Sequence, residues 1–234
     1  SVDLLNATLD SIALDTGANS VSLIIDNVIE LSLSGTMGLA YIKPVGETEA
    51  RYTALTMGDV SITTDNVIAD FGLSGTLTVD NLRYNDGAAG YDRLDWTRAF
   101  DVNGNNIYEE LNPGALLPLP IDLTIDLPGT EHFLIAGSIS SDPPGTPLLT
   151  AGTITLTGSA KFALTRWTVD VDTDGNGTDD LLGAQLDSIA LDVTIASLVV
   201  PNLATLSLDS GYLGLAYLTA SEESEGSLES GLGG

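Results

Sequence analysis

The sequence predicts an all-β protein, built as an elongated antiparallel two-sheet sandwich or prism from degenerate repeats. Two observations carry this prediction: apolar and polar residues alternate with a period of two over long segments, and one segment near the start of the chain recurs near its end. No window shows the i, i+3, i+4, i+7 apolar stripe of an amphipathic helix. A β-solenoid, or β-helix, is the alternative, and the irregular spacing of the copies argues against it.

The alternation is clearest in three segments, each with apolar side chains on one face and mainly Ser, Thr or charged side chains on the other. They are Ile29–Tyr41, Leu73–Val79 and Ile154–Thr165. Such segments are typical of strands with one buried and one solvated face. A glycine stands at a matching place in each segment (Gly35, Gly75 and Gly158), where it indicates a bend, a bulge or a close backbone approach.

A repeat links the two ends of the chain. Asp3–Asp15 recurs as Asp180–Asp192 with eleven of thirteen residues identical, at an offset of 177. The likeness continues more loosely from Leu31–Tyr41 to Leu206–Tyr217, which contains one extra residue. Repeated units bury their faces against like neighbours, so we expect the two copies to have one structure.

The repeat and the length together predict one domain. We expect a single all-β domain over residues 1–220, in which residues 2–42 resemble residues 179–218. A tail rich in Glu, Ser and Gly follows over residues 221–234, and this composition is typical of disorder.

The charge of the chain is strongly negative, with 33 acidic residues against 7 basic ones and a net charge of −26. Such a field repels nucleic acid and anionic membrane surfaces, and it attracts divalent cations. There is no cysteine, which excludes disulfides, thiolate metal sites and thiol catalysis. Acidic, cysteine-free chains rich in Gly, Ser and Thr are common among secreted proteins of Gram-negative bacteria. We therefore expect an extracellular or cell-surface protein without a membrane-spanning helix.

Two acidic loops carry the strongest chemical signal. The first offers oxygen atoms at alternate positions, from Asp172, Asp174, Asn176, Thr178 (through its backbone carbonyl) and Asp180. The second repeats this spacing with Asp101, Asn103, Asn105, Ile107 (through its backbone carbonyl) and Glu109. Calcium takes about six to eight oxygen ligands, and a tight glycine-containing loop brings alternate residues to one centre. We expect calcium at both loops; the alternatives are Asx-rich turns without a metal and, more weakly, magnesium.

The Asp172 loop resembles the DxDxDG calcium loops of dockerins, thrombospondin type 3 repeats and EF-hands over about nine residues. This resemblance implies calcium binding by the alternating oxygens. Gly183 stands where EF-hands carry a glutamate, and no flanking helices are expected, so we place the loop in a β-rich setting. The rest of the chain shares no motif with a specific family and is similar only in style to fibre and pilus subunits.

We expect no enzymatic activity. His132 is the single histidine, no G-x-S-x-G motif precedes it, and a surface position is expected for it. Glycoside hydrolysis by a pair of carboxylates remains an alternative in so acidic a chain, although the sequence singles out no pair. Arg98 and Arg166, close to the two loops, are the residues to test for a lyase, but they are expected to pair with carboxylates. The aromatic residues expected in the core are Trp96, Trp167, Tyr41 and Tyr217.

The sequence favours a structural function. The first hypothesis is an extracellular subunit that assembles with copies of itself into a surface fibre, pilus or biofilm matrix. Assembly would proceed by β-strand addition with Val2–Asp15 or the tail as the donated segment, stabilised by calcium. The second is a calcium-dependent adhesin or carbohydrate-binding domain whose partners are surface glycans. The third, and weakest, is an enzyme such as a polysaccharide lyase.

Overall fold

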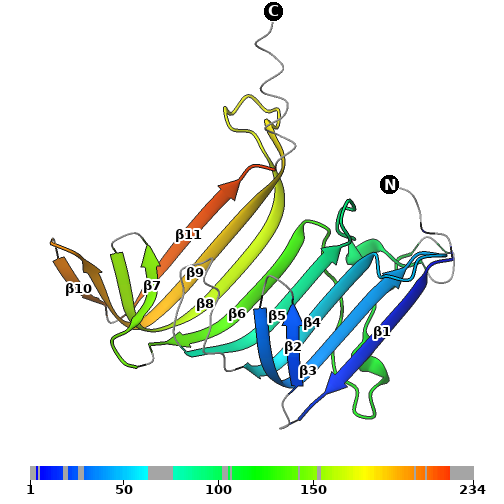
Figure 1. The fold of residues 1–234 in the computed structure, drawn as a ribbon, viewed down its shortest axis with the longest axis horizontal. Helices are drawn as coiled ribbons and strands as arrows, with labels where there is room; N and C mark the ends of the chain where they lie inside the picture. Colours follow the sequence, from blue (N-terminus) through cyan, green and yellow to red (C-terminus); the bar gives the residue numbers. More distant parts are fainter. Residues whose placement is uncertain are drawn as a thin grey trace, which may run out of the picture.

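The computed structural model describes residues 4, 6–17, 21–25, 29–62, 76–101, 105, 107–141, 143–151, 154–202, 204–208 and 210–221. Within these residues the chain is all-β, and its strands form one open antiparallel sheet (Figure 1). In order across the sheet the strands are β1 (Thr8–Asp15), β3 (Ile29–Lys43), β4 (Tyr52–Ile62), β5 (Thr76–Gly87), β6 (Glu131–Ser140), β8 (Ile154–Val171), β9 (Leu181–Val200) and β11 (Gly211–Thr219).

Three short strands complete the sheet, each beside one half of a long strand. They are β2 (Val21–Ile25) beside β3, β7 (Pro147–Ala151) beside β8, and β10 (Ala204–Leu208) beside β9. Two short 3-10 helices, η2 (Trp96–Arg98) and η3 (Pro113–Leu116), lie in the segment between β5 and β6. None of the helices in the described part of the chain is long and apolar enough to cross a membrane.

The long strands change partner along their length. β3 pairs first with β2 and then with β1, and β8 pairs first with β7 and then with β6. The change falls at Gly35 and Gly158, where φ is 137° and 127° and the register shifts beside the glycine. Glycine alone adopts such a backbone conformation readily, so these two glycines mark bends as the sequence predicts. Gly75, the third predicted position, lies outside the described residues.

Both faces of the sheet bury apolar side chains. In β3, Leu39 packs on a large cluster formed by β4, β5, β6, β7, β8 and β9, whereas its neighbour Ala40 faces a smaller cluster on the opposite side. The described residues of the segment over residues 88–130 cover that opposite face. Trp96, 1% exposed, anchors it by donating from Nε1 to Oδ1 of buried Asn85 at 3.0 Å. The expectation that Trp96 lies in the core is therefore confirmed.

The architecture differs from the expected two-sheet sandwich. The described strands belong to one sheet, because strands that bend at a glycine keep their hydrogen bonds on both sides and stay within one network. A loop segment, and not a second sheet, covers the far face at β3 and β4. All pairings between the described strands are antiparallel, whereas a β-helix, the alternative, pairs its strands in parallel.

β1 and β11 are the two terminal strands of the sheet, and no described strand pairs with the outer side of either (Figure 1). Tyr217 on β11 is 59% exposed, so the expectation that it is buried is wrong. The physical reason is position: Tyr217 has β9 on one side only, whereas Tyr41, half-buried, lies on β3 between β1 and β4. The predicted tail is outside the described residues except for Ser221, which donates from Oγ to the Leu182 carbonyl at 2.9 Å.

Candidate functional site

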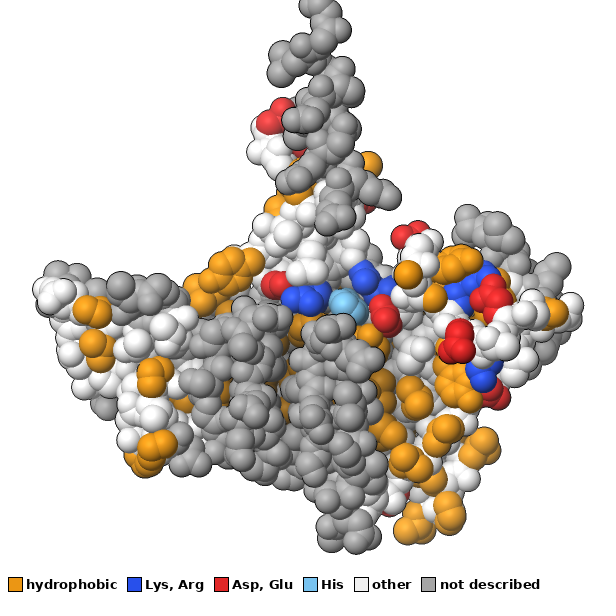
Figure 2. Space-filling model, in the orientation of Figure 1, with side chains coloured by type: hydrophobic (Ala, Val, Ile, Leu, Met, Phe, Trp, Pro, Cys, Tyr) orange, Lys and Arg blue, Asp and Glu red, His pale blue; other side chains and the backbone are white. Residues whose placement is uncertain are grey.

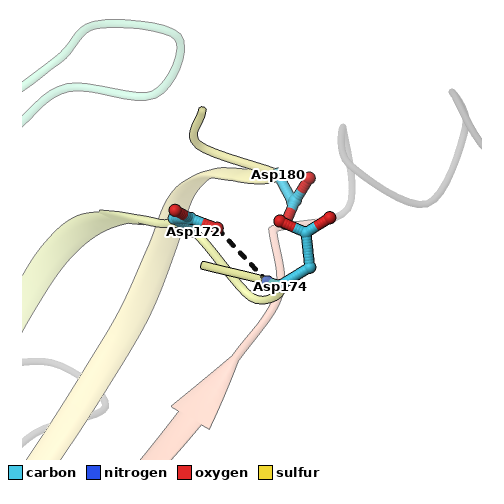
Figure 3. Close-up of side chains that lie close together, drawn as sticks. All are labelled: Asp172, Asp174 and Asp180. Carbon is cyan, nitrogen blue, oxygen red and sulfur yellow. Dashed lines mark hydrogen bonds between the residues drawn. The ribbon is translucent and has the colours of Figure 1, made fainter. Parts of the chain in front are cut away.

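The first acidic loop connects β8 to β9 and gathers three carboxylates (Figure 3). One carboxylate oxygen from each of Asp172, Asp174 and Asp180 lies within 4.8 Å of the others. Asp172 is half-buried and the other two are exposed to solvent. The expected spacing therefore brings three of the five predicted ligands of this loop to one place.

Backbone groups of the loop hold Asp172 in an anionic form. Its Oδ2 accepts from the Gly177 N–H at 2.7 Å, and its Oδ1 accepts from the Gly175 N–H at 2.7 Å. These hydrogen bonds, with that from Gly177 the largest contribution, lower the pKa of Asp172 below its usual value. The carboxylate is thus charged and oriented near neutral pH.

The other two carboxylates are also fixed locally. Oδ2 of Asp180 accepts from Thr173, from Oγ1 at 2.6 Å and from the backbone N–H at 2.9 Å, and the side-chain bond contributes most to lowering the Asp180 pKa. Oδ1 of Asp174 accepts from the Asn176 N–H at 3.0 Å. The predicted ligands Asn176 and Thr178 follow in the same loop, where the Asn176 side-chain oxygen accepts from the Thr178 N–H at 2.8 Å. Three convergent, charged carboxylates can hold a metal ion, and the geometry does not select which one.

The second acidic loop shows hydrogen bonds from the backbone to single side chains, one of them an Asx turn at Asn105, instead of a carboxylate cluster. Oδ1 of Asp101 accepts from the Asn105 N–H at 3.0 Å, and Oδ1 of Asn105 accepts from the Ile107 N–H at 2.7 Å. The backbone N–H of Glu109 donates to the Phe100 carbonyl at 2.8 Å. Asn103, the remaining predicted ligand, lies outside the described residues. In the described part of the chain, a group of three acidic side chains able to hold a metal occurs at the first loop only.

A polar hollow lies on the same face of the sheet as the larger apolar cluster, near the ends of β8 and β9. Its lining includes Arg93, His132, Arg166, Thr168 and Gln185, and Figure 2 shows the single histidine among basic side chains on this face. A two-pronged ion pair borders the hollow: Nε and Nη2 of Arg166 donate to the two oxygens of Asp187 at 2.7 and 2.9 Å. The expectation that Arg166 pairs with a carboxylate is confirmed.

Arg98 likewise forms the expected ion pair. Its Nη2 lies 2.7 Å from Oδ2 of Asp95, the N-cap residue just before η2. Arg98 is exposed, so this pair contributes little to stability. Neither arginine therefore stands as a free base beside an acidic loop, as a lyase of the type considered from sequence would require.

His132 lies on β6, where it lines the polar hollow and is half-buried. Its side chain is 20% exposed, and its ring centre lies 5.5 Å from that of Tyr84. Burial, followed by the positive charge of Arg93, lowers the pKa of His132 to about 4, so the ring is neutral near pH 7. The register shift between Glu131 and Phe133 places it there, and no feature of the sequence marks that shift.

The strand pairs at the two ends of the sheet, β1 with β3 and β9 with β11, pair corresponding residues in the same way. In β1–β3, Asp10 lies opposite Tyr41, Ile12 opposite Leu39 and Leu14 opposite Met37. In β9–β11, Asp187 lies opposite Tyr217, Ile189 opposite Leu215 and Leu191 opposite Leu213. These are the residues that the sequence alignment of the two copies matches.

Comparison of the chain with models of known protein families, with curated proteins and with solved structures finds no match.

Proposed function

We propose that this protein is an extracellular structural subunit that assembles with copies of itself into a surface fibre, pilus or biofilm matrix. Assembly proceeds by β-strand addition, and calcium stabilises the assembled form. The single observation that carries this proposal is the uncharged, exposed terminal strand β11 on an open sheet.

Among the described residues, β11 shows none of the features that usually protect a sheet edge from association. Gly211–Thr219 contains no charged residue and no proline, although the chain as a whole carries 33 acidic residues. Soluble proteins usually block an edge with charge, proline, a bulge or a covering segment, because its free N–H and C=O groups can add another strand. Three large side chains of β11 are also exposed: Tyr212 (89%), Tyr217 (59%) and Leu218 (44%).

β1 offers a second edge at the opposite end of the sheet. It exposes three apolar side chains, Leu9 (37%), Ile12 (44%) and Leu14 (37%). We interpret the N-terminal and C-terminal hairpins as degenerate copies of one unit, because their corresponding residues pair alike. A sheet that begins and ends with the same unit can continue from one molecule into the next.

The acidic loop supports a role for a divalent cation. Its three carboxylates suit a hard cation with oxygen ligands, and calcium at extracellular, roughly millimolar concentrations is the cation that we propose. Subunits with a net charge of −26 repel one another at close range. Bound calcium reduces this repulsion and holds the loop between β8 and β9 in one conformation.

Electron microscopy and light scattering test this function on three forms of the protein: the full chain, the chain without residues 1–15, and Ala216→Lys. Ala216 lies on β11 with its side chain exposed, so a lysine there places a charge on the edge without filling the core. We expect large assemblies of the full chain in calcium and loss of assembly in both variants, with unchanged circular dichroism for Ala216→Lys. Equal assembly by the chain without residues 1–15 and by Ala216→Lys contradicts the proposal.

The polar hollow favours a second candidate function, a calcium-dependent adhesin or carbohydrate-binding domain. Arg93 donates to Oγ1 of Thr168 and has no carboxylate partner among the described residues, so it can contact a polar ligand. Glycan binding that is lost in Asp172→Ala while assembly stays intact would favour this candidate over the structural one.

A further inference from the structure

We infer that the joint between subunits pairs β11 of one copy antiparallel with β1 of the next, with Tyr217 opposite Asp10, Leu215 opposite Ile12 and Leu213 opposite Leu14. This inference rests on the proposed function and specifies its partner surface. The occupant of each edge is a second copy of the same chain.

The register has a precedent inside the chain. On its inner side, β11 pairs with the segment Asp187–Asp192, whose sequence is DSIALD. β1 carries the same six letters as Asp10–Asp15. In the inferred joint, β11 is therefore flanked on both sides by the same sequence, aligned on the same residues.

The directions and faces of the strands agree with this joint. β1 and β9 run the same way, because an even number of antiparallel steps separates them in the sheet. The partner β3 lies on the same side of β1 as the partner β11 lies of β9. Asp10 and Asp187 lie on the same face of the sheet, that of the larger apolar cluster. A second copy whose β1 lies beside β11 thus has the same orientation as the first, and both faces of the sheet continue across the joint.

The backbone donors and acceptors of the two edges also match in this register. Successive residues of a strand direct their N–H and C=O groups alternately to its two sides. Asp10 on β1 and Asp187 on β9 have the same strand direction and the same face, and each pairs with a tyrosine on the same side, Tyr41 and Tyr217. Both pairs are therefore of the same type, either hydrogen-bonded or non-hydrogen-bonded. No described strand pairs with the outer sides of β1 and β11, and the backbone groups on these two sides match when Asp10 lies opposite Tyr217.

Side chains and charge select this joint among alternatives. A slip of one residue would turn Ile12 and Leu14 away from the face that carries Leu213 and Leu215. Pairing of β1 with β1 would bring two strands that each carry Asp10 and Asp15 together, and these carboxylates would repel one another. β11 has no charged residue, so pairing of β1 with β11 avoids this repulsion. Because the β11–β1 joint is heterologous, each added copy again presents a free β1 or β11, so the sheet can continue into an open-ended assembly.

Disulfide trapping tests the register, since the chain has no cysteine of its own. Ser11 and Ala216, both exposed, lie opposite each other in the inferred joint. Ser11→Cys and Ala216→Cys are mixed in calcium under mild oxidation. The matched control replaces Ala216→Cys with Leu218→Cys, which is opposite Ser11 only after a slip of two residues. We expect the first mixture to form the mixed disulfide at least about tenfold faster than the control.

The outcomes separate the joint from the function. Assembly of the mixtures without preferential linking of Ser11→Cys to Ala216→Cys overturns the joint and leaves the structural function standing. Rapid disulfide dimers of Ala216→Cys alone also overturn it, because they show that β11 pairs with β11. Wild-type chains that remain monomeric in calcium contradict the proposed function itself.

Discussion

Thr16 and Gly35 exchange hydrogen bonds where β3 changes partner. The Thr16 N–H donates to the Gly35 carbonyl at 2.9 Å, and the Gly35 N–H donates to Oγ1 of Thr16 at 2.8 Å. Ser141 and Gly158 repeat the arrangement in β8, with the Gly158 N–H donating to Oγ of Ser141 at 2.9 Å and the Ser141 N–H donating to the Gly158 carbonyl at 2.8 Å. A hydroxyl residue just after one strand thus satisfies the backbone of the glycine at which its neighbour bends.

Replacing Thr16 with valine tests this arrangement. Thr16→Val keeps the shape of the side chain but leaves the Gly35 N–H without its acceptor, so we expect the free energy of unfolding to fall by about 1 kcal/mol. Thr16→Ser, which retains the hydroxyl, should stay close to wild type. Urea unfolding followed by circular dichroism measures both, and equal stability of the valine and serine variants would show that the hydroxyl contributes nothing.

Arg166 and Asp187 form the ion pair that borders the polar hollow, with side chains only 20% and 17% exposed. Arg166→Gln leaves the carboxylate of Asp187 largely buried without its cation, and we expect a loss of about 2 kcal/mol of stability. Asp187→Asn in the same background should recover part of the loss. A double-mutant cycle from urea unfolding measures the coupling, and additive effects of the two substitutions would exclude a direct interaction.

Stability should depend on pH through His132. Its folded pKa of about 4 lies below the usual 6.5, so between these values the unfolded chain binds a proton that the folded chain does not. The free energy of unfolding that depends on His132 is therefore fully present above about pH 6.5 and is lost as the pH falls toward 4. At roughly 1.4 kcal/mol per pKa unit, the loss is about 3 kcal/mol. His132→Gln should flatten the unfolding free energy over this window, and an unchanged pH profile would contradict the assigned burial.

Alternation of side chains located two of the long strands correctly, and the described part of a third predicted segment, Thr76–Val79, lies in β5. The segments Ile29–Tyr41 and Ile154–Thr165 lie within β3 and β8, because a strand with one buried face shows its period directly in the sequence. The same period does not say what covers the buried face. The sequence of the covering segment over residues 88–130 shows no regular alternation of apolar and polar residues. The sequence alone therefore could not distinguish one sheet covered by a loop from two packed sheets.

Local spacing also predicted the acidic loop, where Asp172, Asp174 and Asp180 meet because Asx turns at Asp172 and Asp174 fold the chain on itself. The number of neighbouring strands beside a given residue could not be predicted from the sequence. Tyr41 and Tyr217 occupy corresponding sequence positions, yet the first has a strand on each side and the second only one. A property set by distant neighbours leaves no mark on the local sequence.

Metal binding should stabilise the fold through the carboxylate cluster. We expect millimolar calcium to raise the unfolding temperature of wild type, and Asp174→Asn to remove most of this increase because it takes one charge from the cluster. Asp179→Asn is the matched control: Asp179 is an exposed carboxylate of the same loop but not part of the cluster. Thermal unfolding with and without chelator measures the effect, and equal responses of the two variants would indicate general charge screening instead of a site.

Sedimentation velocity of the full chain tests self-assembly through the sheet edges most directly, first in millimolar calcium and then in excess chelator. Ala216→Lys, with its charge on β11, is measured beside it. The account predicts large, calcium-dependent species for wild type and a monomer for Ala216→Lys in both conditions. A wild-type monomer in both conditions would contradict self-assembly and leave a ligand-binding adhesion domain as the better explanation of the open sheet and its polar hollow.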